Sequence, residues 1–342
     1  MTPGDGFIAI GGSSGSGTTL LAAVLGRHPR LYCGPELSCL DKAELYERPW
    51  PAYRRRFRRD PQARLEIEDV RWRRPMFDGL AETPVARPEL AALAAAATNY
   101  ADYVRAFETL LTRRTNRARW VEKTPTNVFC AGRLLEAFPD ARFVHLVRDG
   151  RDSLVSQLRR GRSLHHAAWI WLCAAAAGVR LRDHPRVLTL RYEEMTAKPE
   201  ATLRGICDWL GEAFEGSILS GTGGGGTVHD SWTSSPAEPI NQRSVARYLS
   251  ELDRQTEELF YSFRLTDVGR EMYEAPFASV PEALEYWGYE PKRSSWPDAT
   301  LEYRLKARAP SALKRIELRL RGKQVADHAP QSLIRWAGSP ED

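Results

Sequence analysis

A glycine-rich turn between an apolar strand and a helix is the feature that most constrains this chain. Phe7–Gly11 predicts a short strand, and Thr18–Leu25, followed by Gly26, predicts a helix. The turn between them reads Gly12-Ser13-Ser14-Gly15-Ser16-Gly17-Thr18-Thr19. In such a turn, backbone N–H groups and the positive end of the helix converge on an anion. A glycine-rich connection that binds nothing is the alternative, but the position between strand and helix favours a phosphate site.

The spacing of the turn matches a nucleoside-triphosphate loop in all but one position. Such loops read G-x-x-x-x-G-K-[ST], and Gly12 and Gly17 fit, but Thr18 replaces the lysine. That lysine neutralises the β- and γ-phosphates of ATP or GTP. Its absence argues against hydrolysis of a triphosphate and favours a nucleotide with a shorter 5′ anion. A nucleotide kinase or related phosphotransferase remains the alternative.

Strand and helix patterns alternate along the rest of the chain, which predicts an α/β fold with a parallel sheet flanked by helices. We expect one domain over residues 1–299, with a mostly helical insertion at about 40–118, and a basic helical extension over 300–342 that includes an amphipathic helix at Leu301–Lys323. The further strands are expected at Arg119–Val121, Arg142–Val147 and Val187–Leu190, and the further helices at Asn127–Phe138, Asp152–Arg160, Leu164–Arg182 and Pro199–Leu210.

A second candidate anion site follows the strand Arg142–Val147. Arg148 comes directly after this strand, at the edge of a parallel sheet where ligands bind. Its planar guanidinium suits a phosphate, and Ser156, eight residues later, offers a hydroxyl from the following helix. A surface ion pair between Arg148 and Asp152 is the alternative for this segment.

Composition limits the location and the partners. The 342 residues carry a net charge of +5, which suits an anionic ligand but gives little support for nucleic acid. No apolar run approaches the ~20 residues of a membrane span, and no signal peptide is recognised. Five scattered cysteines without metal-ligand spacing predict a reduced, cytoplasmic protein, with a fragment trimmed of its leader as the alternative. The arginines at 54–59, with Arg71, Arg73 and Arg74, are expected on a solvated face, with recruitment of an acidic acceptor as the functional alternative.

Together these segments resemble the sulfotransferases that use 3′-phosphoadenosine 5′-phosphosulfate, particularly the branch with protein-tyrosine sulfotransferases and many bacterial enzymes. Gly15-Ser16-Gly17-Thr18-Thr19 is similar to the R-S-G-T-T loop of that family, and Arg148 to Ser156 has its spacing. Glu122-Lys123-Thr124-Pro125 resembles its E-K-T-P segment, Arg191-Tyr192-Glu193-Glu194 its R-Y-E-D turn, and Leu284–Pro291 its L-G-Y-x-P motif with Trp287 in the leucine place. The likeness covers residues 7–40 and 119–291 in patches.

The resemblance implies the sulfotransferase fold, the phosphosulfate donor, a hydroxyl acceptor and no metal. It assigns the 5′-phosphosulfate to the first loop and the 3′-phosphate to the arginine and serine of the second motif. The implied donor-binding residues are Ser14, Gly15, Ser16, Gly17, Thr18, Thr19, Arg148, Ser156, Tyr192 and Ser244. Gly15 departs from the family arginine, so Lys123, or more distantly Arg27, would supply the missing cation. This departure also leaves open a nucleotide-binding protein that has lost catalysis.

Glu36 and Lys123 are the candidate catalytic residues. The Cys33-Gly34-Pro35-Glu36 segment resembles that of tyrosine sulfotransferases, where a glutamate at the same offset serves as base. Lys123 would stabilise charge on the departing oxygen. Glu36 as a helix-capping carboxylate, and His28 or His145 as the base, are the alternatives. The acceptor, whether a tyrosine or other phenol, a sugar or a secondary metabolite, and the oligomeric state are not readable from the sequence.

Overall fold

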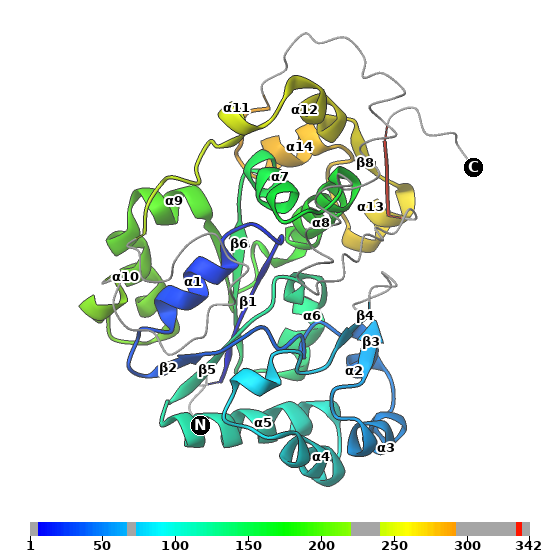
Figure 1. The fold of residues 1–342 in the computed structure, drawn as a ribbon, viewed down its shortest axis with the longest axis vertical. Coiled ribbons are helices and arrows are strands. Elements are labelled where there is room, and N and C mark those ends of the chain that lie inside the picture. Colours follow the sequence, from blue (N-terminus) through cyan, green and yellow to red (C-terminus); the bar gives the residue numbers. More distant parts are fainter. Residues whose placement is uncertain (1–5, 67–72, 220–239, 292–332, 337–342) are drawn as a thin grey trace. The chain divides into compact units, whose positions relative to one another are not determined.

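The computed structural model describes residues 6–66, 73–219, 240–291 and 333–336 (Figure 1). Its chain divides into two compact units. Unit 1 takes in the ranges 1–12, 17–146 and 181–241, and unit 2 the ranges 13–16, 147–180 and 242–342. The amphipathic helix expected at Leu301–Lys323 lies outside the described residues.

The described part of unit 1 is built on a five-stranded sheet with the order β2-β5-β1-β6-β7. The pairs β1–β5, β1–β6 and β2–β5 are parallel, with Ile10 opposite Lys123 and Gly12 opposite Leu146. The expected α/β fold with a parallel sheet is therefore confirmed. The strands are β1 (Ile8–Gly12), β2 (Leu31–Cys33), β5 (Arg119–Lys123), β6 (Arg142–Val147) and β7 (Val187–Arg191).

The central strands β1 and β5 are buried over their whole length, because helices cover the sheet. Figure 1 shows α1 on one side of β1 and α6 on the other, and both contact that strand. A short helix, α9, follows β7 and packs on α10. The helices are α1 (Thr18–Leu25), α6 (Asn127–Ala137), α9 (Tyr192–Ala197) and α10 (Pro199–Leu210), with a 3₁₀ turn at Gly216–Ile218. A further 3₁₀ turn, Val179–Leu181, includes residues of both units.

The segment between β2 and β5 is mainly helical, and it also contains an antiparallel pair of strands, β3 and β4, that the sequence pattern does not indicate. Its elements are α2 (Ala43–Glu47), α3 (Trp50–Arg59), β3 (Arg64–Glu66), β4 (Arg73–Pro75), a 3₁₀ turn at Leu80–Glu82, α4 (Arg87–Ala96) and α5 (Tyr100–Thr115). Buried aromatic rings hold these elements together, with Phe77 against Tyr103 and Phe107, and Trp50 against Phe57. The arginines of α3 at 54–56 and 58–59 are exposed, as predicted.

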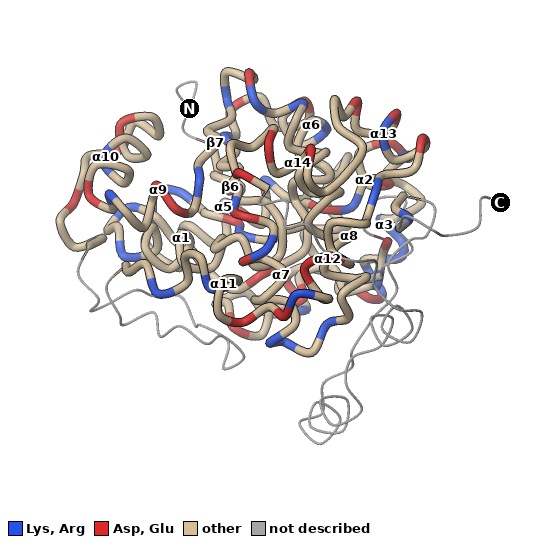
Figure 2. The backbone as a smooth tube through the Cα atoms, turned by 90° about the horizontal axis from the view of Figure 1, so that it is seen from above, with Lys and Arg blue, Asp and Glu red and all other residues tan. Residues whose placement is uncertain are grey.

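In unit 1, the charged residues of α10 alternate in sign along the helix (Figure 2). There Arg204 pairs with Glu200 one turn earlier, at 2.8 Å between Nη2 and Oε1. Such an exposed pair contributes little to stability but keeps the surface of the helix mixed in charge.

Unit 2 is organised around α8, whose residues are almost all buried. It packs against α7, α12, α13 and α14, and against β8, which pairs antiparallel with β9. The elements are α7 (Gly150–Arg159), α8 (Leu164–Ala177), α11 (Tyr248–Glu251), α12 (Arg254–Tyr261), β8 (Phe263–Leu265), α13 (Asp267–Tyr273), α14 (Val280–Tyr286) and β9 (Ile334–Trp336). None of the helices in the described ranges has both the length and the hydropathy that a membrane crossing needs.

Candidate functional site

A connected chain of polar contacts lies at the carboxyl edge of the unit 1 sheet. Lys123, the last residue of β5, donates from Nζ to Thr19 Oγ1 on α1 at 3.2 Å. The same Nζ lies 2.6 Å from Glu36 Oε1. The side chain of Lys123 is 6% exposed and that of Glu36 is 21% exposed. One ammonium group therefore joins the first turn of α1 to a carboxylate that solvent still reaches.

Glu36 lies in an irregular segment after β2, and hydrogen bonds from this segment to the side chains of Glu122 and Thr124 hold it in place. Leu37 N donates to Glu122 Oε1 at 3.3 Å, and Ser38 N donates to Thr124 Oγ1 at 3.1 Å. No helix begins at Glu36, since α2 starts only at Ala43. The helix-capping alternative for Glu36 is therefore wrong.

Glu122 is a buried carboxyl directly before Lys123. Burial raises its pKa to about 7, against hydrogen bonds from Thr124 and Asn127 that lower it. Thr124 Oγ1 donates to Glu122 Oε1 at 2.6 Å, and Asn127 Nδ2 donates to Oε2. The carboxyl thus connects β5, α6 and the Glu36 segment within unit 1.

Arg74 is a residue near the candidate base that the sequence analysis placed elsewhere. Its Nη1 lies 3.5 Å from Glu36 Oε2, and its Nη2 donates to Asp78 Oδ2 at 2.9 Å. The side chain is only 18% exposed, so the prediction that Arg74 belongs to a solvated face is wrong. Burial lowers the pKa of Arg74, but the carboxylates of Glu36, Asp41 and Asp78 raise it by more than burial lowers it. The pKa of Arg74 is therefore above its ordinary value.

The helix side of the glycine-rich turn belongs to unit 1. Gly17 precedes α1 with φ of 97°, and a Cβ at this position would collide with the ring of Tyr192. Only glycine meets both conditions. Tyr192 is buried against this turn, and Thr18 is buried while Thr19 is half-buried. The first N–H groups of α1 have no acceptor within the helix, which makes this helix start suited to an anion.

The strand side of the turn, Ser13–Ser16, belongs to unit 2. Ser16 N donates to Ser13 O at 3.0 Å, and Gln157 of α7 donates from Nε2 to Ser14 O. Gly15 has φ of 95°, and a Cβ there would lie 3.1 Å from Ser153 O and 3.2 Å from Ser156 Cβ. Gly15 and Ser156 are therefore in close contact. Ser16 Oγ is buried, and no hydrogen-bond partner is found for it among the described residues.

Arg148 is buried and binds two backbone carbonyls within unit 2. Its Nη1 donates to Gly15 O at 2.8 Å and its Nη2 to Ser244 O. Its backbone carbonyl accepts from Trp171 Nε1 at 3.1 Å. Arg148 also lies 3.8 Å from Asp152 in an i,i+4 pair, but both side chains are buried, so the surface ion pair is wrong as an account of this residue.

Asp152 tethers the segment that contains Ser244 to α7. Its Oδ2 accepts from Ala246 N at 2.8 Å and its Oδ1 from Tyr248 N at 3.1 Å. Burial raises the pKa of Asp152, and the nearby Arg148 lowers it. Ser156 is half-buried on the same helix, and its Oγ accepts from Arg160 Nη2 at 3.0 Å.

The alternatives for the base and for the missing cation are engaged elsewhere. His28 donates from Nε2 to Ala213 O at 2.9 Å and accepts at Nδ1 from Arg30 N at 3.2 Å. His145 is buried in β6, where burial lowers its pKa to about 4. Arg27 is buried and donates to Ile218 O at 3.1 Å. These residues serve the fold of unit 1.

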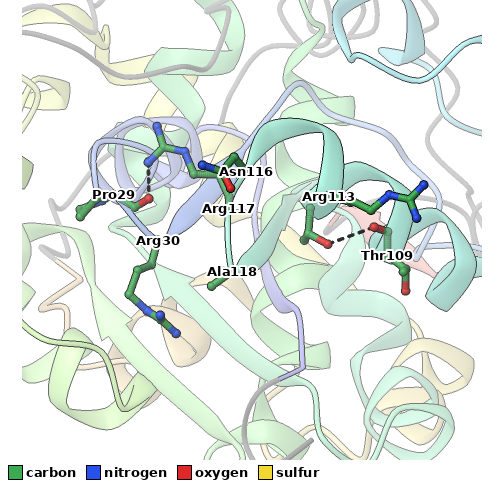
Figure 3. A pocket seen from close by; sticks show the side chains of 8 residues that line it. Pro29, Arg30, Thr109, Arg113, Asn116, Arg117 and Ala118 are labelled. Carbon is green, nitrogen blue, oxygen red and sulfur yellow. Dashed lines mark hydrogen bonds between the residues drawn. The ribbon is translucent and has the colours of Figure 1, made fainter.

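A cavity of about 560 Å³ in unit 1 does not contain the predicted site (Figure 3). It is lined by Arg30, Arg113, Arg117 and Ala118, among others. Arg30 and Ala118 directly precede β2 and β5, so the cavity lies at the amino ends of these strands. Lys123 stands at the opposite end of β5, and the cavity is therefore separate from the Lys123–Glu36 contact.

Sequence reasoning missed Arg74 and Gln157 as neighbours of the candidate residues, and it considered Asp152 beside Arg148 only as the partner in a surface ion pair. Asp152 lies four residues after Arg148, a spacing that brings two side chains to one side of a helix. Gln157 directly follows Ser156 on the same helix. For Arg74 the sequence offers no comparable signal, because it is distant along the chain from Glu36 and comes from a strand of only three residues.

Comparisons with known proteins agree with the resemblance. Residues 8–216 match the model of the sulfotransferase family. Protein-tyrosine sulfotransferase A of Caenorhabditis elegans is 24% identical over 224 residues, covering 62% of this chain and 52% of that protein. Protein-tyrosine sulfotransferase 2 of Gallus gallus is 21% identical over 267 residues, covering 72% and 64%. The chain thus spans about half to two-thirds of the length of these relatives.

The solved structures that resemble this chain include the sulfotransferase domain of the Synechococcus PCC 7002 olefin synthase. It is 20% identical, with a TM-score of 0.47, covering 83% of this chain and 95% of that one. The family model alone matches more than half of the chain, across the glycine-rich turn, the E-K-T-P segment and the Arg148 motif. This chain belongs to the sulfotransferase family.

Proposed function

We propose that this protein transfers a sulfuryl group from 3′-phosphoadenosine 5′-phosphosulfate to the hydroxyl of an acceptor. The observation that carries the proposal is the contact of Lys123 Nζ with both Thr19 Oγ1 and Glu36 Oε1. A cation at a helix start suits an anionic donor, and an accessible carboxylate beside it suits a hydroxyl that must lose its proton. Family membership supports the same reaction.

The glycine-rich turn fits the 5′ end of such a donor. Gly15 and Gly17 both have positive φ, a backbone conformation that glycine adopts readily and that is common in anion-binding turns. Ser16 Oγ is buried in the turn, and a donor oxygen would give it an acceptor. When bound, the donor supplies an activated sulfuryl group and 3′-phosphoadenosine 5′-phosphate as leaving group. We assign its 5′ end to Ser14–Thr19 and its 3′-phosphate to Arg148 and Ser156, and we assign Ser244 and Tyr192 to donor binding as well.

The residues of unit 1 would then divide the chemistry between them. Glu36 accepts the proton of the acceptor hydroxyl while the acceptor oxygen bonds to sulfur. The bond between sulfur and the 5′-phosphate oxygen breaks, and Lys123 stabilises the negative charge that develops on that oxygen. Thr19 and the N–H groups at the start of α1 bind the phosphate as this happens. A cation in place before the reaction gives this stabilisation without reorganisation of solvent.

The direct test is transfer of label from ³⁵S-labelled donor to a panel of hydroxyl compounds. The panel contains tyrosine peptides with and without flanking acidic residues, simple phenols, sugars and hydroxylated secondary metabolites. We expect labelled product with at least one class and none without protein. Transfer of ³²P from ATP–Mg to any of the same compounds, with no sulfuryl transfer, would instead establish the phosphotransferase alternative. Tight binding of the donor without transfer to any compound would favour a protein that has lost catalysis.

A further inference from the structure

The insertion of unit 1 contacts the candidate base directly, through residues 74–79. Its β4 strand carries Arg74, and the turn that follows carries Asp78 and Gly79. None of these residues belongs to the family motifs of the chain.

Two cations from different elements flank the Glu36 carboxylate, one at each oxygen. Lys123 Nζ is 2.6 Å from Oε1, and Arg74 Nη1 is 3.5 Å from Oε2. A carboxylate held at one oxygen can still rotate about its last side-chain bond, because that torsion is soft. A second charged partner on the other oxygen restricts this rotation and favours the ionised form.

The backbone of the turn is docked on the same segment. Asp78 N donates to Leu37 O at 2.9 Å, and Gly79 N donates to Glu36 O at 3.1 Å. A Cβ on Gly79 would lie 2.5 Å from Pro35 Cβ and 3.0 Å from Glu36 O, so glycine is needed for this close approach. The backbone of Glu36 is therefore fixed by the insertion independently of its side chain.

The turn is in turn anchored to the core of the insertion. Phe77 is fully buried against Tyr103 and Phe107, and its carbonyl accepts from Gln62 Nε2 at 2.8 Å. Arg74 is itself oriented by Asp78, at 2.9 Å. Rigid packing of this kind is what a group needs in order to hold another in a productive geometry.

We propose that Arg74 is a positioning residue that holds the Glu36 carboxylate ionised and in a fixed orientation. The inference rests on the proposed function for its catalytic meaning, since it assigns Arg74 to the base of that reaction. Arg74 touches no reacting atom in this account and acts through Glu36. It makes the insertion a working part of the reaction centre rather than only a cover for the sheet.

The charges around Glu36 determine whether a substitution makes proton binding to its carboxylate easier or harder. Among the described residues, the charged groups near it include Lys123 from β5 and Arg74 from β4, with Asp78 and Asp41 close to Arg74 and the Glu122 carboxyl bonded to Leu37 N. Loss of the Arg74 charge makes proton binding to Glu36 easier. Loss of the Asp78 charge has the opposite effect, because it removes a negative charge and a competitor for Arg74.

The test is a pH titration of the Glu36 carboxyl by ¹³C NMR on the full chain with labelled glutamate. The resonance is identified by its disappearance in E36Q. We expect Arg74→Met to move the midpoint to higher pH by about 1 pH unit, and Arg74→Lys to restore most of the difference. Asp78→Asn, at a side chain that is 40% exposed and so tolerant of change, should move it to lower pH. Arg87→Met is the matched control, since Arg87 is an exposed arginine of the same insertion that pairs with Asp60.

The outcomes separate this inference from the proposed function. Opposite shifts in Arg74→Met and Asp78→Asn, with none in Arg87→Met, support the inference. If Arg74→Met does not fold, the Asp78→Asn shift alone decides. An unmoved midpoint in the folded Arg74 and Asp78 variants overturns the role of Arg74, whatever the activity. Full sulfuryl transfer by E36Q would instead contradict the proposed base.

Discussion

At the scale of the residue, the most informative group is Lys123, because it links two side chains that the sequence could only propose separately. Thr19 belongs to the glycine-rich turn and Glu36 to the segment after β2, and both lie within hydrogen-bond distance of its Nζ. An ammonium group with three donors can serve both at once. The candidate base and the candidate phosphate site are thus connected within unit 1.

Replacement of Glu36 by glutamine tests the base. Gln retains the shape of the side chain but cannot accept a proton near neutral pH, so turnover should fall by ~10²-fold or more while the affinity for 3′-phosphoadenosine 5′-phosphate stays near wild type. Initial rates with labelled donor and calorimetry measure the two quantities. Glu82→Gln, at an exposed glutamate of the same unit, serves as the control. Equal turnover in both variants would move the base to another residue.

Glu122 gives the fold a pH dependence of known sign. Its pKa in the folded state is about 7, raised by burial from an ordinary 4.5. Between these values the folded state binds more protons than the unfolded state, so this carboxyl makes the protein less stable as pH rises from 4.5 to 7. The difference amounts to about 3 kcal/mol in the free energy of unfolding.

Urea unfolding of wild type and Glu122→Gln at pH 5 and pH 8 measures this contribution. The glutamine loses hydrogen bonds at both values, so the absolute stability of the variant is not the readout. We expect the variant to lose less stability than wild type between the two pH values. Parallel losses would show that Glu122 does not titrate in this range.

At the scale of the element, the agreement between sequence and structure follows the strength of the local signals. The expected bounds of α1, α10 and β6 are those of the structure, because each has an apolar pattern and clear end signals such as Gly26, Pro199 and Gly211. The hairpin β3–β4 was not predicted, since three-residue strands carry no periodicity. Arg74 could not be predicted as a neighbour of Glu36 for the same reason.

The segment around Ser244 depends on one carboxylate of α7. Asp152 accepts hydrogen bonds from the backbone of Ala246 and Tyr248, and bonds of this charged kind contribute about 1.5–3 kcal/mol each. Asp152→Ala should therefore speed amide exchange at these two residues by at least ~10-fold, as measured by hydrogen exchange and NMR. Asp267→Ala, at an exposed aspartate in the same unit, provides the comparison. Unchanged exchange in the Asp152 variant would mean that other contacts hold the segment.

At the scale of the whole molecule, the match to the family model includes the sheet and the sequence motifs but does not extend over the rest of the chain. The family model ends at residue 216, and the curated relatives are longer than this chain. The sequence could predict the order of the two candidate anion-binding motifs, because each is local and lies after a recognisable strand. It could not predict the contacts of the insertion, which depend on packing between distant segments.

The central claim is that the protein binds a nucleotide phosphorylated at both the 5′ and the 3′ position. Calorimetry with 3′-phosphoadenosine 5′-phosphate and with AMP isolates the 3′-phosphate, the single group by which they differ. Wild type should prefer the bisphosphate strongly over AMP and over ATP–Mg. Arg148→Ala should remove ~2–4 kcal/mol of affinity for the bisphosphate and much less for AMP. Equal affinities of wild type for the bisphosphate and AMP, or a preference for ATP–Mg, would contradict the account.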